Sequence, residues 1–209
     1  MQIYDSSLSI SCLMVIYKHR IKETKQKGID MTKFSINAQA LKAVSMAANK
    51  KDISRRVLMG VYITPNEIVA IDSYRMHRYV FYNRIDEVPE DGILIDASLF
   101  SKIKASQEFV SFEKIEDDKW IIDSQIANVI EGKYPDYKSI LEERYGECDK
   151  FGVNPDYMTD AMKAVKIVHG KRNKIGNAVI NVTSPLHPIR IKASHDEGFE
   201  AIIMPVRLG

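Results

Sequence analysis

The same order of predicted elements occurs three times along the chain, and this repetition limits the possible folds more than any other feature. The first copy is predicted to contain a strand, a helix and three further strands, at residues 34–37, 38–49, 57–64, 68–72 and 75–82. Leu41, Val44 and Ala47 are spaced to lie on one face of that helix. Pro65-Asn66 is typical of a turn between two strands.

Two further copies follow the first. The second is predicted at residues 92–96, 97–105, 109–115, 119–123 and 125–131, and the third at residues 150–153, 155–168, 178–183, 189–193 and 198–205. Each copy has one helix and one small sheet, so a single copy cannot bury both faces. Two copies can bury their helices against a shared sheet. The natural domain is therefore a pair, which leaves the third copy without an internal partner.

The composition restricts the partners and the compartment. Charged residues make up 28% of the 209 residues, but the net charge is only +2, so any contact with nucleic acid has to come from local patches. Cys12 and Cys148 form neither a metal-binding spacing nor a disulfide framework, which favours a reducing cytoplasm. The apolar run at residues 8–17 is too short for a membrane span of about 20 residues, so we expect no membrane association.

The C-terminal residues 201–209 are too apolar for a loose chain end. Pro205 cannot donate a hydrogen bond to a central sheet ladder, so the strand that precedes it should stop there or lie at a sheet edge. A terminal strand that ends in a partly open apolar step can form the wall of a peptide groove. An ordinary C-terminal edge strand is the alternative.

Three stretches, in this order, are similar to motifs of a known family. They are Gly60-Val61-Tyr62-Ile63 with Val69-Ala70-Ile71-Asp72-Ser73-Tyr74-Arg75-Met76, then Glu131-Gly132-Lys133-Tyr134-Pro135-Asp136-Tyr137, and last Ile202-Ile203-Met204-Pro205-Val206-Arg207-Leu208. Together they resemble the bacterial DNA polymerase III beta subunit, the sliding clamp. Residues 151–157 and 184–191 also look like the last half-domain of a clamp.

The resemblance implies an α+β DNA-clamp fold built from three β-α-β-β-β units. It divides the chain into an N-terminal extension and linker (1–32), a domain like the middle domain of the clamp (33–142) and a half-domain like the C-terminal part of the clamp (143–209). A bacterial clamp has three domains of two units each, so one domain and one further half have no counterpart here. We expect the unpaired third copy to drive formation of a homo-oligomer.

No catalytic site is predicted. Asp117-Asp118 and Glu142-Glu143 lie in polar turns or linkers, where a solvated surface is the expected role. The histidines lack neighbours at metal-ligand spacing, and glycine-rich phosphate loops are absent from the sequence. We therefore expect no metal, no cofactor and no enzymatic activity, and the resemblance implies a non-catalytic subunit associated with a DNA polymerase.

Basic residues on or beside the predicted helices are candidates for contact with double-stranded DNA, because helices line the central hole in the family. They are Lys42, Lys50, Lys51, Arg55 and Arg56 in the first copy, Lys102 and Lys104 in the second, and Lys163, Lys166, Lys171, Arg172 and Lys174 in the third. Such residues suit salt-sensitive phosphate contacts without sequence preference. A solvated helix face is the alternative role.

A peptide groove is the second candidate site, since the resemblance implies that clamp-binding peptides dock between the middle and last domains. The matching positions are Leu58, Ile71, Ser73, Arg75 and Met76 in the first copy and Pro188, Ile202, Met204, Pro205, Val206 and Arg207 in the third. Most of these residues are apolar or flexible and fit a Leu or Phe anchor. Alternatively, Leu58 and Ile202 are ordinary core and Met76 fills a gap. Tyr74 stands where the family has a smaller His and would narrow the pocket.

The sequence thus favours a sliding clamp-like processivity factor that binds duplex DNA and the clamp-motif peptides of polymerases. The alternative function is a regulatory clamp mimic, which sequesters clamp-binding proteins or pairs with a full clamp without encircling DNA. The two functions differ in whether the protein assembles around DNA.

Overall fold

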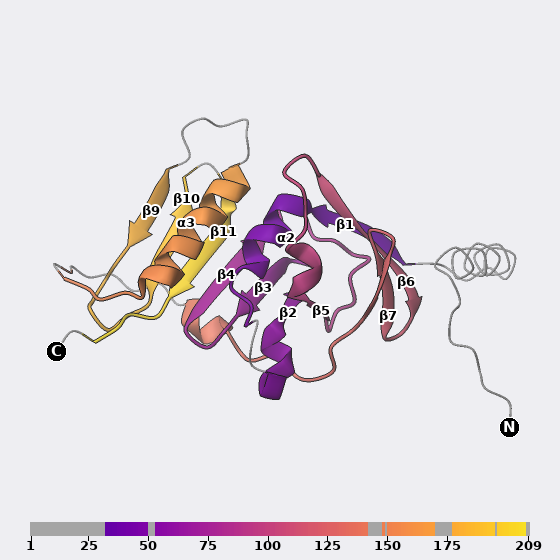
Figure 1. Ribbon diagram of the computed structural model, residues 1–209, viewed down its shortest axis with the longest axis horizontal. Helices are drawn as coiled ribbons and strands as arrows, with labels where there is room; N and C mark the ends of the chain where they lie inside the picture. Colours follow the sequence, from indigo (N-terminus) through magenta and orange to yellow (C-terminus); the bar gives the residue numbers. More distant parts are fainter. Residues whose placement is uncertain are drawn as a thin grey trace, which may run out of the picture. The chain divides into compact units, whose positions relative to one another are not determined.

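Two antiparallel sheets contain the strands of the described chain, which comprises residues 32–49, 53–141, 148, 150–169, 177–194 and 196–207 of a computed structural model (Figure 1). The strands are β1 (Lys33–Asn37), β2 (Gly60–Ile63), β3 (Glu67–Ile71), β4 (Arg75–Val80), β5 (Ile93–Asp96), β6 (Phe109–Glu116), β7 (Lys119–Ile122), β8 (Gln125–Asn128), β9 (Ala178–Asn181), β10 (Ile189–Ala193) and β11 (Asp196–Ile203). The helices are α2 (Ala38–Ser45) and α3 (Pro155–His169), with 3-10 helices η1 (Ile53–Met59), η2 (Ala97–Phe100) and η3 (Lys138–Leu141).

Several predicted features lie outside the described residues. They are residues 1–31 of the N-terminal extension, Glu142 and Glu143 of the linker, the basic residues Lys50, Lys51, Lys171, Arg172 and Lys174, and Leu208 of the tail.

The first two copies exchange strands. The first strand of the first copy, β1, pairs with β6 of the second copy, and β5 of the second copy pairs with β2 of the first. This exchange yields a four-stranded sheet in the order β1-β6-β7-β8 and ties β5 into the other sheet. Helix α2 contacts strands of both sheets. Their shared core contains Phe34, Phe112 and Trp120, whose rings stack or meet edge to face.

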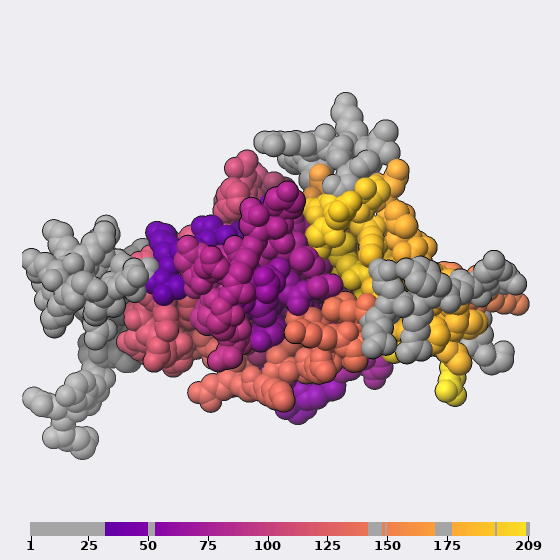
Figure 2. Space-filling view, turned by 180° about the vertical axis from the view of Figure 1, so that it is seen from behind, coloured from indigo at the N-terminus to yellow at the C-terminus, as the bar shows by residue number. Residues whose placement is uncertain are grey.

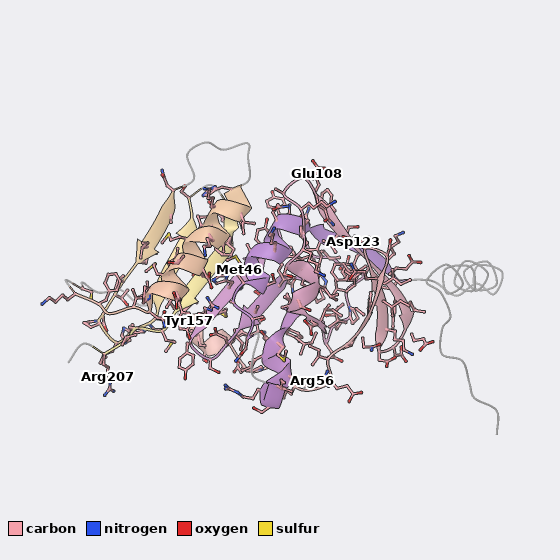
Figure 3. The ribbon with its side chains drawn as sticks, in the orientation of Figure 1. Met46, Arg56, Glu108, Asp123, Tyr157 and Arg207 are labelled. Carbon is pink, nitrogen blue, oxygen red and sulfur yellow. The ribbon has the colours of Figure 1, made fainter. Side chains whose placement is uncertain are left out.

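The third copy joins the first through the pairing of β4 with β11. This pairing runs from Phe199 opposite Tyr79 to Ile203 opposite Arg75, and it produces a seven-stranded sheet in the order β5-β2-β3-β4-β11-β10-β9. Helices α2 and α3 lie together on one face of this sheet (Figure 1). Met46, just after α2, packs against the cluster that includes Ala161 of α3 (Figure 3).

Alternation along the strands gives the seven-stranded sheet two apolar faces. In β11, Phe199, Ala201 and Ile203 point toward α3, whereas Ile202 points to the opposite face, where it meets Met76. We call this second face, the one opposite the helices, the outer face. In β3, burial on both faces explains the continuous apolar run of residues 68–71.

Three predicted elements differ from the structure. The predicted strand at 57–64 begins only at Gly60, because η1 occupies residues up to Met59. The predicted helix at 97–105 is only the four-residue η2, and side chains of α2 bind carbonyls of the segment after it: Lys42 Nζ donates to Ile103 and Gln39 Nε2 to Lys104. The predicted strand at 150–153 is reduced to an isolated bridge between Gly152 and Val206.

The β4–β11 joint contains a buried histidine. His77 Nδ1 donates to the Ala43 carbonyl oxygen of α2 over 2.8 Å, and its ring meets Phe199 of β11 edge to face. Its Nε2 has no hydrogen-bond partner among the described residues. Burial lowers the pKa of His77 to about 4, because a charged imidazolium here would lose its hydration. The neutral ring is therefore the form that fits this joint.

This histidine should make the folded state less stable as the pH falls. The unfolded chain binds a proton at His77 below about pH 6.5, whereas the folded chain does so only below about 4, so stability is lost from 6.5 downward. Between pH 7 and 5 this loss amounts to about 2 kcal/mol. His77→Phe keeps an aromatic ring beside Phe199 and should remove this part of the pH dependence. Urea unfolding of both proteins at pH 7 and pH 5 measures this change in the free energy of unfolding. An equal change in the two proteins would contradict the assignment to His77.

Candidate functional site

The outer face of the seven-stranded sheet carries an apolar cluster that the helices do not cover. Leu58, Ile71 and Met76 of the first copy and Ile202 of the third belong to this cluster. Residues 134–141 lie along it and add Tyr134, Tyr137, Ile140 and Leu141. Figure 2 shows this segment, in coral, between the first copy in purple and the third copy in yellow.

Two tyrosines hold the segment on the sheet. The Tyr137 hydroxyl donates to Glu67 Oε1 over 2.6 Å, and the Tyr134 ring stacks on Tyr62 with 4.8 Å between centroids. Burial, together with the hydrogen bond to Glu67, raises the pKa of Tyr137, so its hydroxyl stays protonated as a donor. The motif at residues 131–137 thus has a structural role: its two tyrosines hold the segment 134–141 against the outer face, where it forms a wall beside the sheet.

A row of charged side chains crosses the same face beside that wall. Arg78 of β4 pairs with Glu67 of β3, and its Nη1 lies 3.9 Å from Glu200 Oε2 of β11. Arg190 of β10 pairs with Glu200 over 2.8 Å and also donates to the Ile140 carbonyl oxygen. These contacts connect η3 and the third copy to the first copy, so the wall and the joint support each other.

Between η1 and residues 131–140, the outer face opens into a pocket of about 670 Å³. Its lining is Ile53, Ser54, Arg55, Arg56, Val57, Leu58, Ile71, Ser73, Glu131, Pro135, Asp136, Tyr137 and Ile140. Leu58, Ile71 and Tyr137 are buried and form an apolar interior, whereas Arg55, Arg56, Glu131 and Asp136 are exposed at the rim. The pocket can therefore take an apolar side chain while the rim contacts polar groups beside it.

The turn between β3 and β4 shapes one side of this pocket. Ser73 has a φ of 80°, in the left-handed region, and its hydroxyl accepts a hydrogen bond from Arg55 Nη1 over 2.8 Å. Asp72 Oδ1 accepts from the amides of Tyr74 and Arg75, which stabilises the turn. Arg55, considered above for DNA contact, thus lies at the rim of the pocket.

The structure separates the predicted groove residues into groups. Leu58, Ile71 and Ser73 line the pocket, and Met76, only 2% exposed, lies with Ile202 in the same apolar cluster. Arg75 points to the helix face instead, where it pairs with Asp72 and with Asp160 of α3.

The remaining tail residues lead away from the pocket. The Met204 amide donates to the Tyr74 carbonyl oxygen, and the Val206 amide donates to Gly152. None of Pro188, Met204, Pro205, Val206 and Arg207 is in the lining, and Arg207 lies far from Arg56 (Figure 3). Tyr74 stacks on Tyr157 of α3, with 6.2 Å between the ring centroids, and is not part of the lining of this pocket.

Sequence reasoning missed most of the rim and one wall. The sequence places Val57 in a strand and Arg56 among the DNA-contact candidates, and the 131–137 motif serves there only as part of the family resemblance. That motif was itself the available signal, because an aromatic and proline-rich stretch after a last strand has to pack somewhere.

The predicted DNA-contact residues are spread over the helix side. Lys42 is half-buried and donates to Ile103, as described above, and Lys163 Nζ lies 3.7 Å from Asp160 Oδ1. Lys102, Lys104 and Lys166 are exposed. Three lysines therefore extend into solvent, two from the segment after η2 and one from α3.

No protein-family model and no curated protein matches the chain. Solved structures do. The DNA polymerase III subunit beta of Borrelia burgdorferi, in complex with a natural product, is 16% identical, with a TM-score of 0.66 over 85% of this chain and 63% of that chain. The C. crescentus beta sliding clamp is 12% identical, with a TM-score of 0.66 over 87% and 67%. The Bacillus subtilis sliding clamp is 17% identical, with a TM-score of 0.61 over 85% and 64%. At these identities the likeness is one of fold.

The contact of Arg75 with α3 should be a main support of the joint beside the site. Its Nη1 lies 2.7 Å from Asp160 Oδ2, its Nε lies 2.9 Å from Asp72 Oδ2, and the guanidinium covers the Tyr157 ring. Arg75→Met leaves both carboxylates without this cation and should lower the free energy of unfolding by about 3 kcal/mol at neutral pH.

The matched control for Arg75 is Arg84→Met. Arg84 also pairs with two carboxylates, Asp86 and Glu90, but these are largely exposed. Arg84→Met should lower the free energy of unfolding by less than about 1 kcal/mol, measured for both variants by denaturant titration. Equal effects of the two variants would refute a special role for Arg75.

Proposed function

Since the described chain has the α+β fold of the bacterial sliding clamps, as its sequence predicted, we propose that it is a non-catalytic clamp-type binding protein. Its outer pocket takes the apolar anchor of a clamp-binding peptide, and its helix side contacts duplex DNA. The chain spans 63% of the length of the Borrelia burgdorferi subunit, so every partner named here belongs to the proposal.

The pocket between η1 and residues 131–140 is the observation that carries the peptide part of the proposal. Burial of one Leu or Phe anchor contributes roughly 1.5–3 kcal/mol. Arg55 and Arg56 on one side and Glu131 and Asp136 on the other offer donors and acceptors to the peptide main chain and to a Gln side chain. A short peptide with a Gln followed by Leu and Phe therefore fits the chemistry of this pocket.

The placement of the exposed lysines supports the DNA part. Lys102, Lys104 and Lys166 lie on the helix side of the protein, away from the peptide pocket. Their contacts would be to phosphates and would release counterions, so binding should weaken steeply as salt is added. Phosphate contacts of this kind do not depend on the base sequence. Binding without sequence preference is what a protein that moves along DNA requires.

Other sequence expectations remain part of the proposal. Among the described residues, no group of three or more His, Cys, Asp and Glu side chains could hold a metal ion. None of the helices described is long and apolar enough to cross a membrane. We infer a cytoplasmic protein from the cysteine pattern alone.

The second candidate function, a regulatory clamp mimic, is favoured by the sheet edge at β9 of the third copy, where a strand of a full clamp could pair. Such a protein would use the outer pocket to occupy clamp-binding peptides but would not encircle DNA. The two functions share the peptide pocket and differ in DNA binding, so the two experiments below distinguish them.

A Gln-Leu-Phe type peptide should bind with micromolar affinity, about −8 kcal/mol. Val57→Asp places a charge in the half-buried pocket lining and should weaken binding at least tenfold. Ile126→Asp, on the exposed strand β8 outside the pocket, is the matched control and should leave affinity unchanged. Fluorescence anisotropy with a labelled peptide measures both, and a peptide that binds all three proteins equally would place the binding site elsewhere.

Duplex DNA should bind weakly, without sequence preference and with a steep salt dependence. Changing Lys102, Lys104 and Lys166 together to Glu should abolish this binding, because these exposed lysines supply the phosphate contacts. Lys133→Glu with Lys138→Glu changes exposed lysines in and after the 131–137 motif instead and should have little effect. Gel shifts over a salt series test this, and salt-independent binding would exclude phosphate contact. No DNA binding at low salt, with peptide binding intact, would favour the clamp mimic.

A further inference from the structure

The third copy carries two strand positions that the other copies fill for each other. In the first two copies, the strand before the helix pairs with the first strand after the helix of the other copy: β1 with β6, and β5 with β2. In the third copy the corresponding segments are residues 150–154 and β9. Among the described residues, strand β9 pairs only with β10 and lies at the edge of the seven-stranded sheet, while Gly152 forms only a bridge to Val206.

The sequence of residues 150–154 is that of a strand in this fold. Lys150-Phe151-Gly152-Val153-Asn154 repeats the pattern of β1, Lys33-Phe34-Ser35-Ile36-Asn37. Both segments end in an Asn that caps the following helix: Asn37 Oδ1 accepts from the Ala40 amide, and Asn154 Oδ1 from the Asp156 amide. The first segment forms a full strand because β6 lies beside it. The second matches it at Lys, Phe and Asn, with Gly152 and Val153 in place of Ser35 and Ile36, but has no neighbouring strand among the described residues.

The core-facing side chains at these two positions are exposed. Phe34 of β1 is 5% exposed and stacks on Phe112 of β6, whereas its counterpart Phe151 is 37% exposed. Ile180 of β9 is opposite the buried Ile191 and so points to the helix face, yet it is 44% exposed. Two apolar side chains that point toward a core therefore lack the half of the core that should cover them.

The chain has no further copy at this place in its sequence. The first copy takes all the residues from β1 to the end of β4, whereas only residues 142–149 separate η3 from the segment at 150–154. The missing half therefore has to come from outside the third copy. Both positions that it would fill, a partner for β9 and a partner for residues 150–154, can be filled by another third copy.

We propose that two chains associate through their third copies and complete one composite domain. Strand β9 of each chain pairs with residues 150–154 of the other, in the way that β6 pairs with β1 inside one chain. Because each chain supplies both elements, a twofold arrangement satisfies both edges at once and needs no other partner. Phe151 and Ile180 of both chains become the centre of the new core. The inference rests on strand pairing and burial and does not depend on peptide or DNA binding.

The first test is the mass of the full-length protein in solution. Sedimentation equilibrium over a concentration series should give twice the 23.8 kDa of one chain. In the same series, hydrogen exchange at the amides of β9 and residues 150–154 should slow as the dimer forms. A monomer at all concentrations would overturn the proposal, including a monomer whose β9 is already protected by another segment of its own chain.

Two variants and a control locate the interface. Ile180→Asp and Phe151→Lys should each weaken dimerisation tenfold or more, because each buries an unpaired charge twice in the twofold interface. Ile126→Asp changes a more exposed isoleucine on β8, the edge of the other sheet, and should leave the dimer intact. Dimers that resist both Ile180→Asp and Phe151→Lys would show that the chains meet elsewhere.

Mixing the two variants guards against misfolding as the cause. A mixed dimer brings the carboxylate of one variant against the ammonium of the other at one strand pair, while the second strand pair keeps the native Ile180 and Phe151. The mixture should therefore recover dimers that neither variant forms alone. Failure to recover them, with both variants folded by circular dichroism, would contradict the reciprocal pairing of β9 with residues 150–154.

Discussion

The pairing of β4 with β11 joins the third copy to the first, and the rest of the structure depends on it. Without this ladder the first copy would end its sheet at β4, and neither Ile202 nor Glu200 would reach the outer face. The ladder is supported on both sides: His77 and Phe199 meet under the helices, and Arg78 pairs with Glu200 on the outer face. Because hydrogen bonds, a buried ring pair and ion pairs coincide here, the two copies form one continuous sheet.

The two faces of this sheet correspond to the two binding surfaces that we propose. The helix side presents α2 and α3, with exposed lysines such as Lys166. The outer side is covered only in part by residues 134–141, and the uncovered remainder beside η1 is the pocket. The pocket is thus the part of the outer face, over Leu58 and Ile71, that residues 134–141 leave open. The hydrogen bond between Tyr137 and Glu67 anchors residues 134–141 to the sheet.

Repetition accounts for the stability of one part of the chain and for the open edges of another. The first two copies exchange β1 and β5 and bury Phe34 and Trp120 in a common core. The third copy has a similar segment, from Lys150 to Asn154, without a paired strand among the described residues. Exposed Phe151 and Ile180 are the direct result, and they distinguish this chain from one in which every unit is paired.

By itself the sequence determined the order of the elements, the α+β fold class and the likeness to sliding clamps, and the structural comparisons confirm the last two. Alternation in β11 and helical spacing in α2 are local patterns, so they can be read without a structure. Only the tertiary structure decided that η2 stays short and that Lys42 and Gln39 bind the carbonyls of the segment after it. Likewise, only the fold placed Arg75 against Asp160 and turned the tail toward Gly152. The physical reason is that side-chain direction at a strand end depends on which segments lie beside it, and those segments are far away in the sequence.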